Sequence, residues 1–558
     1  MNWPDLIVLP IVLPLMAGAL LVLAEKKGGK LPALLAAVAS VAGLLVALLL
    51  LERALTGSVQ AYLLGNWVAP FGVALALDRL SALMVLLTSV IGCITLLYAI
   101  GGDARRGRHF YSLLQFQLMG LNGAFLTADL FNLFVFFEVL LIASYGLLLH
   151  GAGAARLKAS VHYVSFNLAG SALFLIAASL LYGLTGTLNL ADLAQRVPQV
   201  PADRTLLVQS AGLLLVVVFS VKAALLPLYF WLPATYSAAS APSAALFAIM
   251  TKVGVYAILR VTTLIFGETG GPAAFLTTPW LEFLAMGTLL LGAIGAVAAK
   301  SLRAMIGNVV VASAGTLLLS VALNRPETVA AGIFYLVNST LVAAALFLLA
   351  DRLRASRGWA DDDFQSVAAN GAVDDAVDGA VQAANPVNAA KTSALLGVMF
   401  FTFAIGAAGL PPLAGFLGKA MILQAAGQTP WGGWIVTVIL ASSLLTLVAF
   451  AQSGSRLFWR PSPSLAASTA NPQSQLPQRA LPSHVAHHAS LGLLLALLLA
   501  CSVFAGPLWR FTQAAAAQLF ERQAYIGAVL GARAVPAAMD VRRELRTRKN
   551  QATEKAKP

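Results

Sequence analysis

Long apolar runs separated by short polar segments recur along almost the whole chain. Most runs approach the ~20 consecutive apolar residues that an α-helix needs to cross the hydrocarbon core of a bilayer. We therefore predict an all-α polytopic membrane protein with about 14 transmembrane helices. The runs lie at about 5–24, 31–51, 78–100, 110–128, 130–149, 161–184, 206–228, 243–266, 279–299, 304–323, 328–349, 393–425, 432–457 and 489–509.

Proline and glycine interrupt two of these runs. The first, FSVKAALLPLYFWLPATY, contains Pro227, and the second, FAIGAAGLPPLAGFLGK, contains Gly409, Pro411 and Pro412. Proline lacks an N–H group and ends or kinks a helix, and non-helical backbone at membrane depth is tolerated only beside protein or water. Interrupted spans in corresponding positions are typical of transporters built from inverted repeats. We therefore expect two inverted repeats, each with a broken helix and a functional site at the break.

These breaks and the polar segments divide the chain into five expected parts. They are N-terminal transmembrane helices (1–109), a first repeat (110–278), a second repeat (279–459, with a cytoplasmic loop insert at 350–392), a polar loop (460–488), and a last transmembrane helix with a basic tail (489–558). Two polar segments, 361–388 and 461–488, are rich in Ala, Asp and Asn and in Ser, Pro and Gln, respectively, which favours mobile loops. Neither segment carries a recognisable functional motif.

The composition agrees with a membrane protein: 59% of the residues are hydrophobic, 11% are charged, and the formal net charge is +13. In a soluble protein this charge would suggest nucleic acid as a partner, but here the cations gather in alternate loops and in the tail, as the positive-inside rule describes. We expect those loops to be cytoplasmic, the N-terminus to be outside, and no nucleic-acid partner. An even number of spans would put the basic tail outside as well, so the side of the tail stays open. The loop cations are Lys26, Lys27, Lys30, Arg105, Arg106, Arg108, Arg156, Lys158, Lys300 and Arg303.

Cysteine and histidine are sparse. Cys93 and Cys501 lie in separate apolar runs, which implies neither a disulfide framework nor a metal site. The six histidines lie at the ends of runs or in a polar loop, where none can ligate a haem in the middle of the membrane. The sequence therefore predicts no metal and no redox cofactor.

Among the ionisable side chains inside apolar runs, four are candidates for function: Glu138, Lys222, Lys252 and Lys419. A cation at the bilayer centre costs about 2.5–3.5 kcal/mol on insertion scales, so such residues are functional by default. A structural interpretation has the lysines extending to the surface and Glu138 in a static ion pair. In the functional interpretation, Glu138 pairs with Lys222 in one state and releases it in another, and Lys252 and Lys419 continue a proton relay across the membrane plane.

The helix breaks set the electrostatics expected around this relay. Lys222 precedes its break and Lys419 follows its own, so the helix dipole should favour the charge of the first lysine and disfavour that of the second. Water and polar side chains would fill the gaps between the ionisable groups, although each such side chain is equally consistent with helix packing. The candidates are Tyr229, Tyr236, Ser313 and Asn338, with Asn122, Asn132, Ser237 and Ser339 as further possibilities.

Three stretches, VKAALLPLYFWLPATY, MTKVGVY and GLPPLAGFLGKAMIL, give the chain a family resemblance. From about 110 to 459 it resembles the antiporter-like subunits shared by Mrp-type cation/proton antiporters and proton-pumping NADH dehydrogenases. PLYFWLP followed by TKVGVYAI is most similar to the D-type subunits of the Mrp (Mnh, Pha) branch, because the dehydrogenase relatives usually read PFHxWLP. The resemblance implies a paired switch at Glu138 and Lys222, a middle relay at Lys252 and a terminal lysine at Lys419.

The chain departs from that family in one region. Where relatives carry histidine or lysine in the tenth and eleventh helices, it has Ser313, Asn338 and Ala343. The route between Lys252 and Lys419 must then depend on water, or it carries protons along only part of its length.

These observations imply a proton-translocating subunit of a multi-subunit Na⁺(K⁺)/H⁺ antiporter in the bacterial inner membrane. It would not be an enzyme by itself, and its partners would be other membrane subunits, protons, Na⁺ or K⁺, and the lipid bilayer. One alternative is a proton-pumping membrane subunit of a respiratory dehydrogenase or a membrane-bound hydrogenase. Another is a structural membrane scaffold that transports nothing. The absence of a carboxylate cluster near the breaks suggests that the cation binds largely in a partner.

Overall fold

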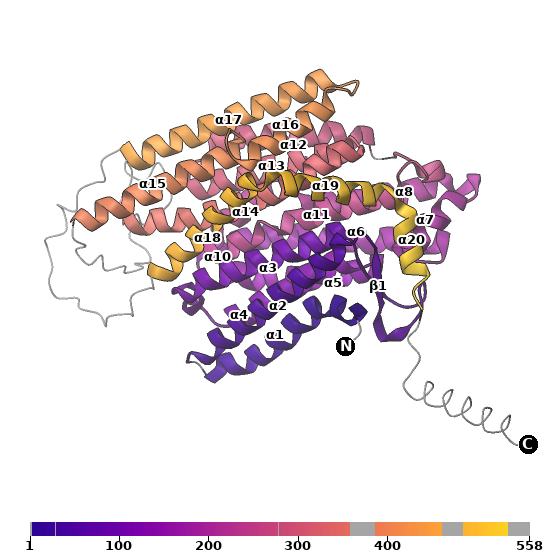
Figure 1. Cartoon of the computed structure of the whole chain (residues 1–558), viewed down its shortest axis with the longest axis horizontal. Helices are drawn as coiled ribbons and strands as arrows, with labels where there is room; N and C mark the ends of the chain where they lie inside the picture. The colour runs from indigo at the N-terminus through magenta and orange to yellow at the C-terminus, as the bar shows by residue number, and fades with distance from the viewer. Residues whose placement is uncertain (1–2, 28, 277, 358–385, 460–483, 534–558) are drawn as a thin grey trace, which may run out of the picture.

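The computed structural model describes residues 3–27, 29–276, 278–357, 386–459 and 484–533. The long helices lie side by side in one bundle, with the first helices along one edge and α17 along the other (Figure 1). The helices are α1 (Leu9–Lys27), α2 (Leu31–Leu55), α3 (Arg79–Ile100), α4 (Phe110–Leu126), α5 (Leu130–Leu149), α6 (Ala154–Thr185), α7 (Leu190–Arg196), α8 (Thr205–Ala223), α9 (Trp231–Ala238), α10 (Ala241–Phe247), α11 (Met250–Leu264), α12 (Thr278–Ala298), α13 (Leu302–Ala322), α14 (Pro326–Arg357), α15 (Pro386–Ala408), α16 (Ala414–Ala426), α17 (Gly432–Trp459), α18 (His484–Val503), α19 (Ala505–Phe520) and α20 (Arg522–Leu530).

The prediction of an all-α multi-pass membrane protein is confirmed. Among the described residues, 12 helical segments are long and apolar enough to cross a membrane. The 17-residue helix α4 and the broken pair α15 and α16 fill the remaining predicted positions, so the count agrees roughly with the fourteen expected. Spans at the centre of the bundle are buried on all sides: every residue of the best apolar window is buried in Ala241–Leu264 and in Pro326–Ser356.

Side-chain contacts gather the predicted cytoplasmic ends of the helices on one side of the bundle. We call this side the basic face, because it carries Lys26, Arg105, Arg156 and Arg303. Its contacts join Glu25 to His109 (3.2 Å), His150 to Asp103 (3.1 Å), and Asp351 to Tyr98 (2.8 Å) and Arg303 (3.1 Å).

The opposite face carries the N-terminal 3-10 helix η1 (Trp3–Val8), helix α7 and a two-stranded hairpin that the sequence did not predict. In the hairpin, β1 (Gln60–Leu63) pairs antiparallel with β2 (Ala74–Leu77). The last helix, α20, packs on α7 and on this hairpin (Figure 1). The last described residues therefore lie on the same face as the N-terminus.

Helix α8 ends at Ala223, and Pro227 lies in the non-helical segment that follows. The main-chain groups freed by this break find partners: Leu225 N–H bonds to Ser220 O at 3.0 Å, and the indole N–H of Trp231 bonds to Val221 O at 3.1 Å. Because these groups are satisfied, the break can persist in an apolar environment.

The second break, between α15 and α16, contains Gly409, Pro411 and Pro412. Gly409 has φ +75°, a conformation that residues with a Cβ rarely adopt. The described residues therefore contain two helices broken at proline, and one lysine, Lys222 or Lys419, lies near each break.

Several predicted boundaries differ from the structure. The run predicted as 243–266 forms two consecutive helices, α10 and α11, and the last run, predicted to end at 509, bends near Phe504 and continues as α19 to Phe520. Helix α14 extends to Arg357, beyond the predicted 349. The polar segments predicted at 361–388 and 461–488 fall mostly outside the described residues, and the division into five parts stays a prediction.

Candidate functional site

The side chains of Glu138 and Lys222 do not form a direct ion pair. Between them lies α6, which offers two polar side chains one turn apart, Asn167 and Ser171. The Ser171 hydroxyl donates a short hydrogen bond to Glu138 Oε1, and Lys222 Nζ donates to Asn167 Oδ1 at 3.0 Å. The predicted pair is therefore linked through a third helix, whose two residues the sequence analysis did not single out.

The two polar groups of α6 are themselves connected. Ser171 Oγ also lies 3.0 Å from the main-chain oxygen of Asn167, and the Asn167 amide N–H donates to Tyr163 O at 2.8 Å. That second contact fixes the amide so that its oxygen faces Lys222. A hydroxyl has one proton, so Ser171 can donate either to Glu138 or to Asn167 O. With that proton turned to Asn167 O, the Ser171 oxygen is free to accept a hydrogen bond from a neutral Glu138.

Close helix packing brings α11 against the end of α8. A Cβ added to Gly254 would lie 2.8 Å from the carbonyl carbon of Lys222 and closer still to Ala223 N. Only glycine allows the two backbones to approach this closely. This contact places Lys252, two residues before Gly254 on α11, near the break in α8.

A small cavity lies between Lys222 and α11. It has a volume of about 20 Å³, enough for one water molecule, and its lining includes Lys222, Asn167, Met250 and Val253. Met250 and Val253 flank Lys252 in the sequence. The cavity therefore adjoins Lys222 and two sequence neighbours of Lys252, and it is large enough for one water molecule.

Lys252 is completely buried, and its Nζ donates to Ser313 Oγ of α13 at 3.0 Å. Ser313 also lines a second cavity, of about 10 Å³, together with Asn338, Ser339 and Gly406. Asn338 Oδ1 is buried and has no hydrogen-bond partner, whereas its Nδ2 donates to Gly406 O at 3.3 Å. An unpartnered buried amide oxygen at a cavity of this size fits a bound water molecule.

Lys419 continues this line on the far side of the second cavity. Its Nζ donates to Ala408 O, the last carbonyl group of α15, at 2.9 Å, and to Ser443 Oγ of α17 at 2.9 Å. The expectation that a helix N-terminus would disfavour its charge is therefore incomplete. The side chain reaches back to the carbonyl end of α15, where the helix dipole favours a cation.

Other polar candidates from the sequence lie apart from this line. Tyr236 donates to Phe247 O at 2.7 Å, and Asn122 donates to Pro10 O at 2.9 Å. Asn132, in the first turn of α5, donates to Thr127 Oγ1 at 3.0 Å. Tyr229 packs its ring against Phe230, and Ser237 bonds to Ala234 O at the protein surface. Of the predicted path residues, the structure thus brings only Ser313, Asn338 and Ser339 to the lysine line.

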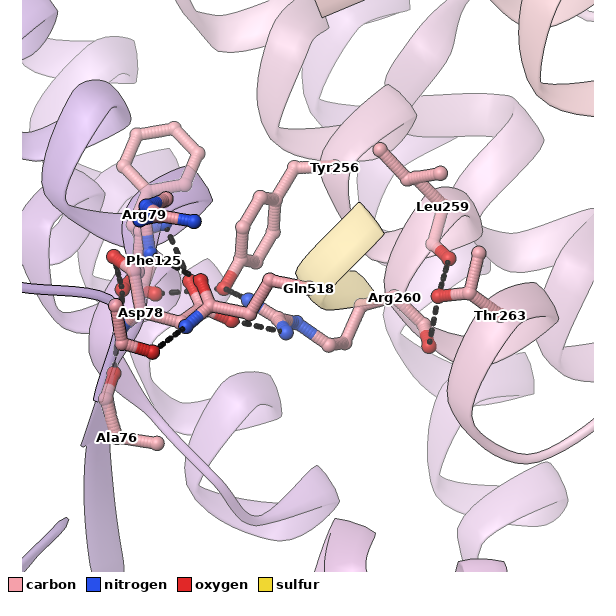
Figure 2. Close-up of polar contacts among 11 residues, drawn as sticks. Ala76, Asp78, Arg79, Phe125, Tyr256, Leu259, Arg260, Thr263 and Gln518 are labelled. Carbon is pink, nitrogen blue, oxygen red and sulfur yellow. Dashed lines mark hydrogen bonds and ion pairs between the residues drawn. The ribbon is translucent and has the colours of Figure 1, made fainter. Parts of the chain in front are cut away.

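A buried ion pair on the opposite face was not predicted. Asp78 Oδ2 lies 2.5 Å from Arg260 Nη1, and Figure 2 shows the two side chains meeting beside Tyr256. Burial would raise the pKa of the Asp78 carboxyl, but the adjacent guanidinium more than offsets this and holds the pKa below its usual value. Sequence signals existed: Asp78 is an N-cap before an apolar helix, and Arg260 lies two turns after Lys252 on α11.

Taken together, the polar contacts join Glu138 to Lys222 through α6, Lys252 to Ser313, and Lys419 to Ser443. One small cavity adjoins Lys222 and the other adjoins Ser313. Within the described ranges, no three His, Cys, Asp or Glu side chains gather in a way that could hold a metal ion.

Comparisons with known proteins give the relatives of this chain. A family model described as NADH:quinone oxidoreductase/Mrp antiporter, TM, matches residues 127–446. The chain is 42% identical to the D subunit of a probable K(+)/H(+) antiporter of Rhizobium meliloti (strain 1021), covering 82% of this chain and 88% of the relative. It is 38% identical to the D subunit of a Na(+)/H(+) antiporter of Bacillus subtilis (strain 168), covering 82% and 87%. A chain in the structure of the Mrp complex from Dietzia sp. DQ12-45-1b superposes with a TM-score of 0.80 at 29% identity, covering 95% of this chain and 100% of that one.

Proposed function

The chain belongs to the NADH:quinone oxidoreductase/Mrp antiporter family, and on this premise we propose that it is the proton-translocating subunit of a multi-subunit Na⁺(K⁺)/H⁺ antiporter in a bacterial inner membrane. The observation that carries the proposal is the series of polar groups from the half-buried Glu138 through the buried Lys222 and Lys252 to the buried Lys419. Other membrane subunits complete the complex and supply the site for Na⁺ or K⁺. The subunit is a transporter component and catalyses no covalent reaction.

Glu138 and Lys222 form the switch of this relay, and α6 mediates between them. With Glu138 ionised, Ser171 donates to its carboxylate, and the negative charge favours an ammonium at Lys222. When Glu138 takes up a proton, its hydroxyl can donate to Ser171, whose proton turns to Asn167 O. Lys222 then loses its nearby negative charge and gives up a proton more readily. The proton passes to Lys252 through the water-sized cavity beside Met250.

Ser313 and the second cavity extend this route where relatives carry an ionisable residue. Lys252 Nζ and Ser313 Oγ are 3.0 Å apart, so a proton can move between them along a formed hydrogen bond. A water held by Asn338 Oδ1 would then face the carbonyl end of α15, where Lys419 is bound. Protons reach the terminal lysine through neutral groups, without the usual histidine or lysine.

The main alternative is a proton-pumping membrane subunit of a redox-driven complex, since the same family includes NADH:quinone oxidoreductase subunits. A third function, a scaffold that moves no ions, would leave the aligned polar groups without a purpose. A buried polar network of this size is costly unless it is used or fully satisfied.

The test uses everted membrane vesicles that contain the whole assembled complex. A pH gradient is imposed, and Na⁺ or K⁺ is added to wild type, Lys222→Ala and Lys158→Ala at matched protein levels. Lys158 is the control, because it is an exposed lysine on α6 away from the relay. We expect cation-dependent collapse of the gradient in wild type and Lys158→Ala, and none in Lys222→Ala.

Each other outcome selects a different function. Equal responses in wild type and Lys222→Ala would make Lys222 structural and refute the relay. Proton pumping that requires a reductant and ignores the cation would identify the redox-driven complex. Loss of assembly in Lys222→Ala, with no cation response in wild type, would favour the scaffold.

A further inference from the structure

Helix α11 carries a second polar stretch that the relay does not use. Lys252, Tyr256 and Arg260 follow one another at intervals of four residues, so they lie along one side of the helix. Lys252 is near the start of α11, and Arg260 lies toward its end on the opposite face, where it meets Asp78 at the start of α3. A row of polar side chains therefore leads from the relay toward that face.

Tyr256 and Arg260 are each held by defined contacts, as Figure 2 shows. Arg260 Nη2 donates to the Tyr256 hydroxyl at 3.0 Å, and that hydroxyl donates to Phe125 O at 2.7 Å. Asp78 caps α3 through Ser81, whose main-chain N–H donates to Asp78 Oδ1 at 2.8 Å. The carboxylate and the guanidinium thus each have contacts besides the ion pair, and both side chains are buried.

The C-terminal helices cover this pair from outside. The Arg260 guanidinium lies between the rings of Tyr256 and Tyr525, at 5.2 and 5.1 Å from their centroids. On α19, Gln518 accepts from Arg79 N at 2.9 Å and donates to Gly57 O at 2.9 Å. These contacts hold α19 and α20 over the end of the polar row.

Stability alone is a weak reason for such a pair, because replacing a buried ion pair by apolar residues is often neutral or stabilising. A fixed guanidinium in a narrow polar passage has a further effect, since its positive charge repels protons and other cations. Arg260 lies two turns after Lys252 on α11, where the helix meets Asp78 at the opposite face.

We propose that the polar row of α11 is the passage between Lys252 and the opposite face, and that the Asp78–Arg260 pair is the gate that closes it. With the pair formed and covered by Tyr525, protons do not leak between the relay and that face. Separation of Arg260 from Asp78 opens the passage during transport. This inference rests on the proposed antiporter function.

The test measures passive proton leak and cation-driven exchange on the same assembled complex in vesicles. The double variant Asp78→Asn/Arg260→Gln removes both charges and leaves no unpaired ion. Without Na⁺ or K⁺, an imposed pH gradient should collapse about tenfold faster than in wild type, because the ion pair that closes the passage is lost. Arg260→Lys keeps the charge and should leak as little as wild type.

A matched control is the pair Asp192 and Arg196, which also lies on the opposite face, with 2.9 Å between its charged atoms. It belongs to α7 and has no place on the α11 row, so Asp192→Asn/Arg196→Gln should show the wild-type leak. If the double variant of Asp78 and Arg260 does not assemble, Tyr525→Leu replaces it. This change uncovers the guanidinium without altering charge and should also raise the leak.

The outcomes separate this inference from the function on which it rests. A wild-type leak in both Asp78→Asn/Arg260→Gln and Tyr525→Leu, with normal cation exchange in wild type, overturns the gate and leaves the antiporter intact. Equal leaks in Arg260→Lys and the double variant also overturn it, because the effect would then be structural. No cation exchange in wild type refutes the proposed function, whatever the leak.

Discussion

The ammonium group of Lys222 donates to the side-chain oxygen of Asn167 at 3.0 Å, and this contact, not one with Glu138, holds the lysine in the structure. The switch therefore has three helices where the sequence predicted two. Because Asn167 is also fixed by Tyr163 O, it can position Lys222 whether or not Glu138 is ionised. Asn167 is a positioning residue for the relay.

Replacing Asn167 by Ala should impair transport. Lys222 would keep only the main-chain oxygen of residue 167, at 3.5 Å, and a hydrogen bond to a charged group contributes about 1.5–3 kcal/mol. We expect cation-dependent collapse of a pH gradient in everted vesicles to slow about tenfold. Ser160→Ala is the control, because Ser160 is buried on the same helix but lies outside the relay. Transport at the wild-type rate in Asn167→Ala would contradict the role given to α6.

The second cavity supplies another prediction. Asn338→Leu keeps the approximate volume but removes the unpartnered oxygen that would hold a water between Lys252 and Lys419. Loss of one bridging hydrogen-bond partner should reduce transport by about tenfold in the same vesicle assay. Thr340→Val is matched to it, since Thr340 is buried on the same helix and bonds only to Leu336 O. If both variants transport normally, the central route does not pass Asn338.

Gly254→Ala should disturb both stability and transport. The added Cβ would clash with Ala223 N, and backbone cannot shift as cheaply as a flexible side chain. Overpacking of this kind typically costs about 1–3 kcal/mol, so the purified complex should unfold at a lower temperature. Gly183→Ala on α6 meets no atom within 4 Å and should leave the unfolding temperature unchanged. An unfolding temperature of Gly254→Ala equal to that of wild type would show that α8 and α11 can move apart without loss of stability.

The Asp78 carboxyl predicts how stability depends on pH. Its pKa in the folded protein is below the ordinary 3.8, so its pairing with Arg260 stabilises the fold above that pH, and the contribution is lost as the pH falls through the lowered pKa. In thermal unfolding of the detergent-solubilised protein, wild type should lose part of its stability below about pH 4. Asp78→Asn/Arg260→Gln should lose less over the same interval. Acid profiles of identical shape would mean that Asp78 does not titrate as the pair predicts.

The sequence predicted the helical fold, and it pointed to three lysines inside apolar runs for a clear physical reason. Placing a lysine such as Lys252 inside an apolar run costs free energy, so such a residue is conspicuous in the sequence without further information. Asn167 and Ser171 do not stand out, because neutral polar residues are common in membrane helices. Asn167 and Ser171 are four residues apart on the helix after Glu138, which puts both side chains on one face of that helix. This spacing indicates a polar contact only once the helices that pack against that face are known.

The ion pair on the opposite face was missed for another reason. Asp78 and Arg260 are 182 residues apart, and each lies near the end of an apolar run, where a charge normally reaches water. In the structure, α19 and α20 cover this end of the bundle and contribute to the burial of the pair. The sequence analysis had treated the residues after 509 as a tail, so it could not supply that cover.

The partners of the three lysines have a common position: Asn167, Ser313 and Ser443 each lie near the middle of their helices, α6, α13 and α17. A proton that moves from Lys222 to Lys419 therefore stays at nearly constant depth in the membrane. Such a move does almost no work against the transmembrane voltage, which acts along the membrane normal at about 2.3 kcal/mol per charge per 100 mV. Nearly all of the voltage dependence of transport must then arise in the steps that join this central line to the two faces.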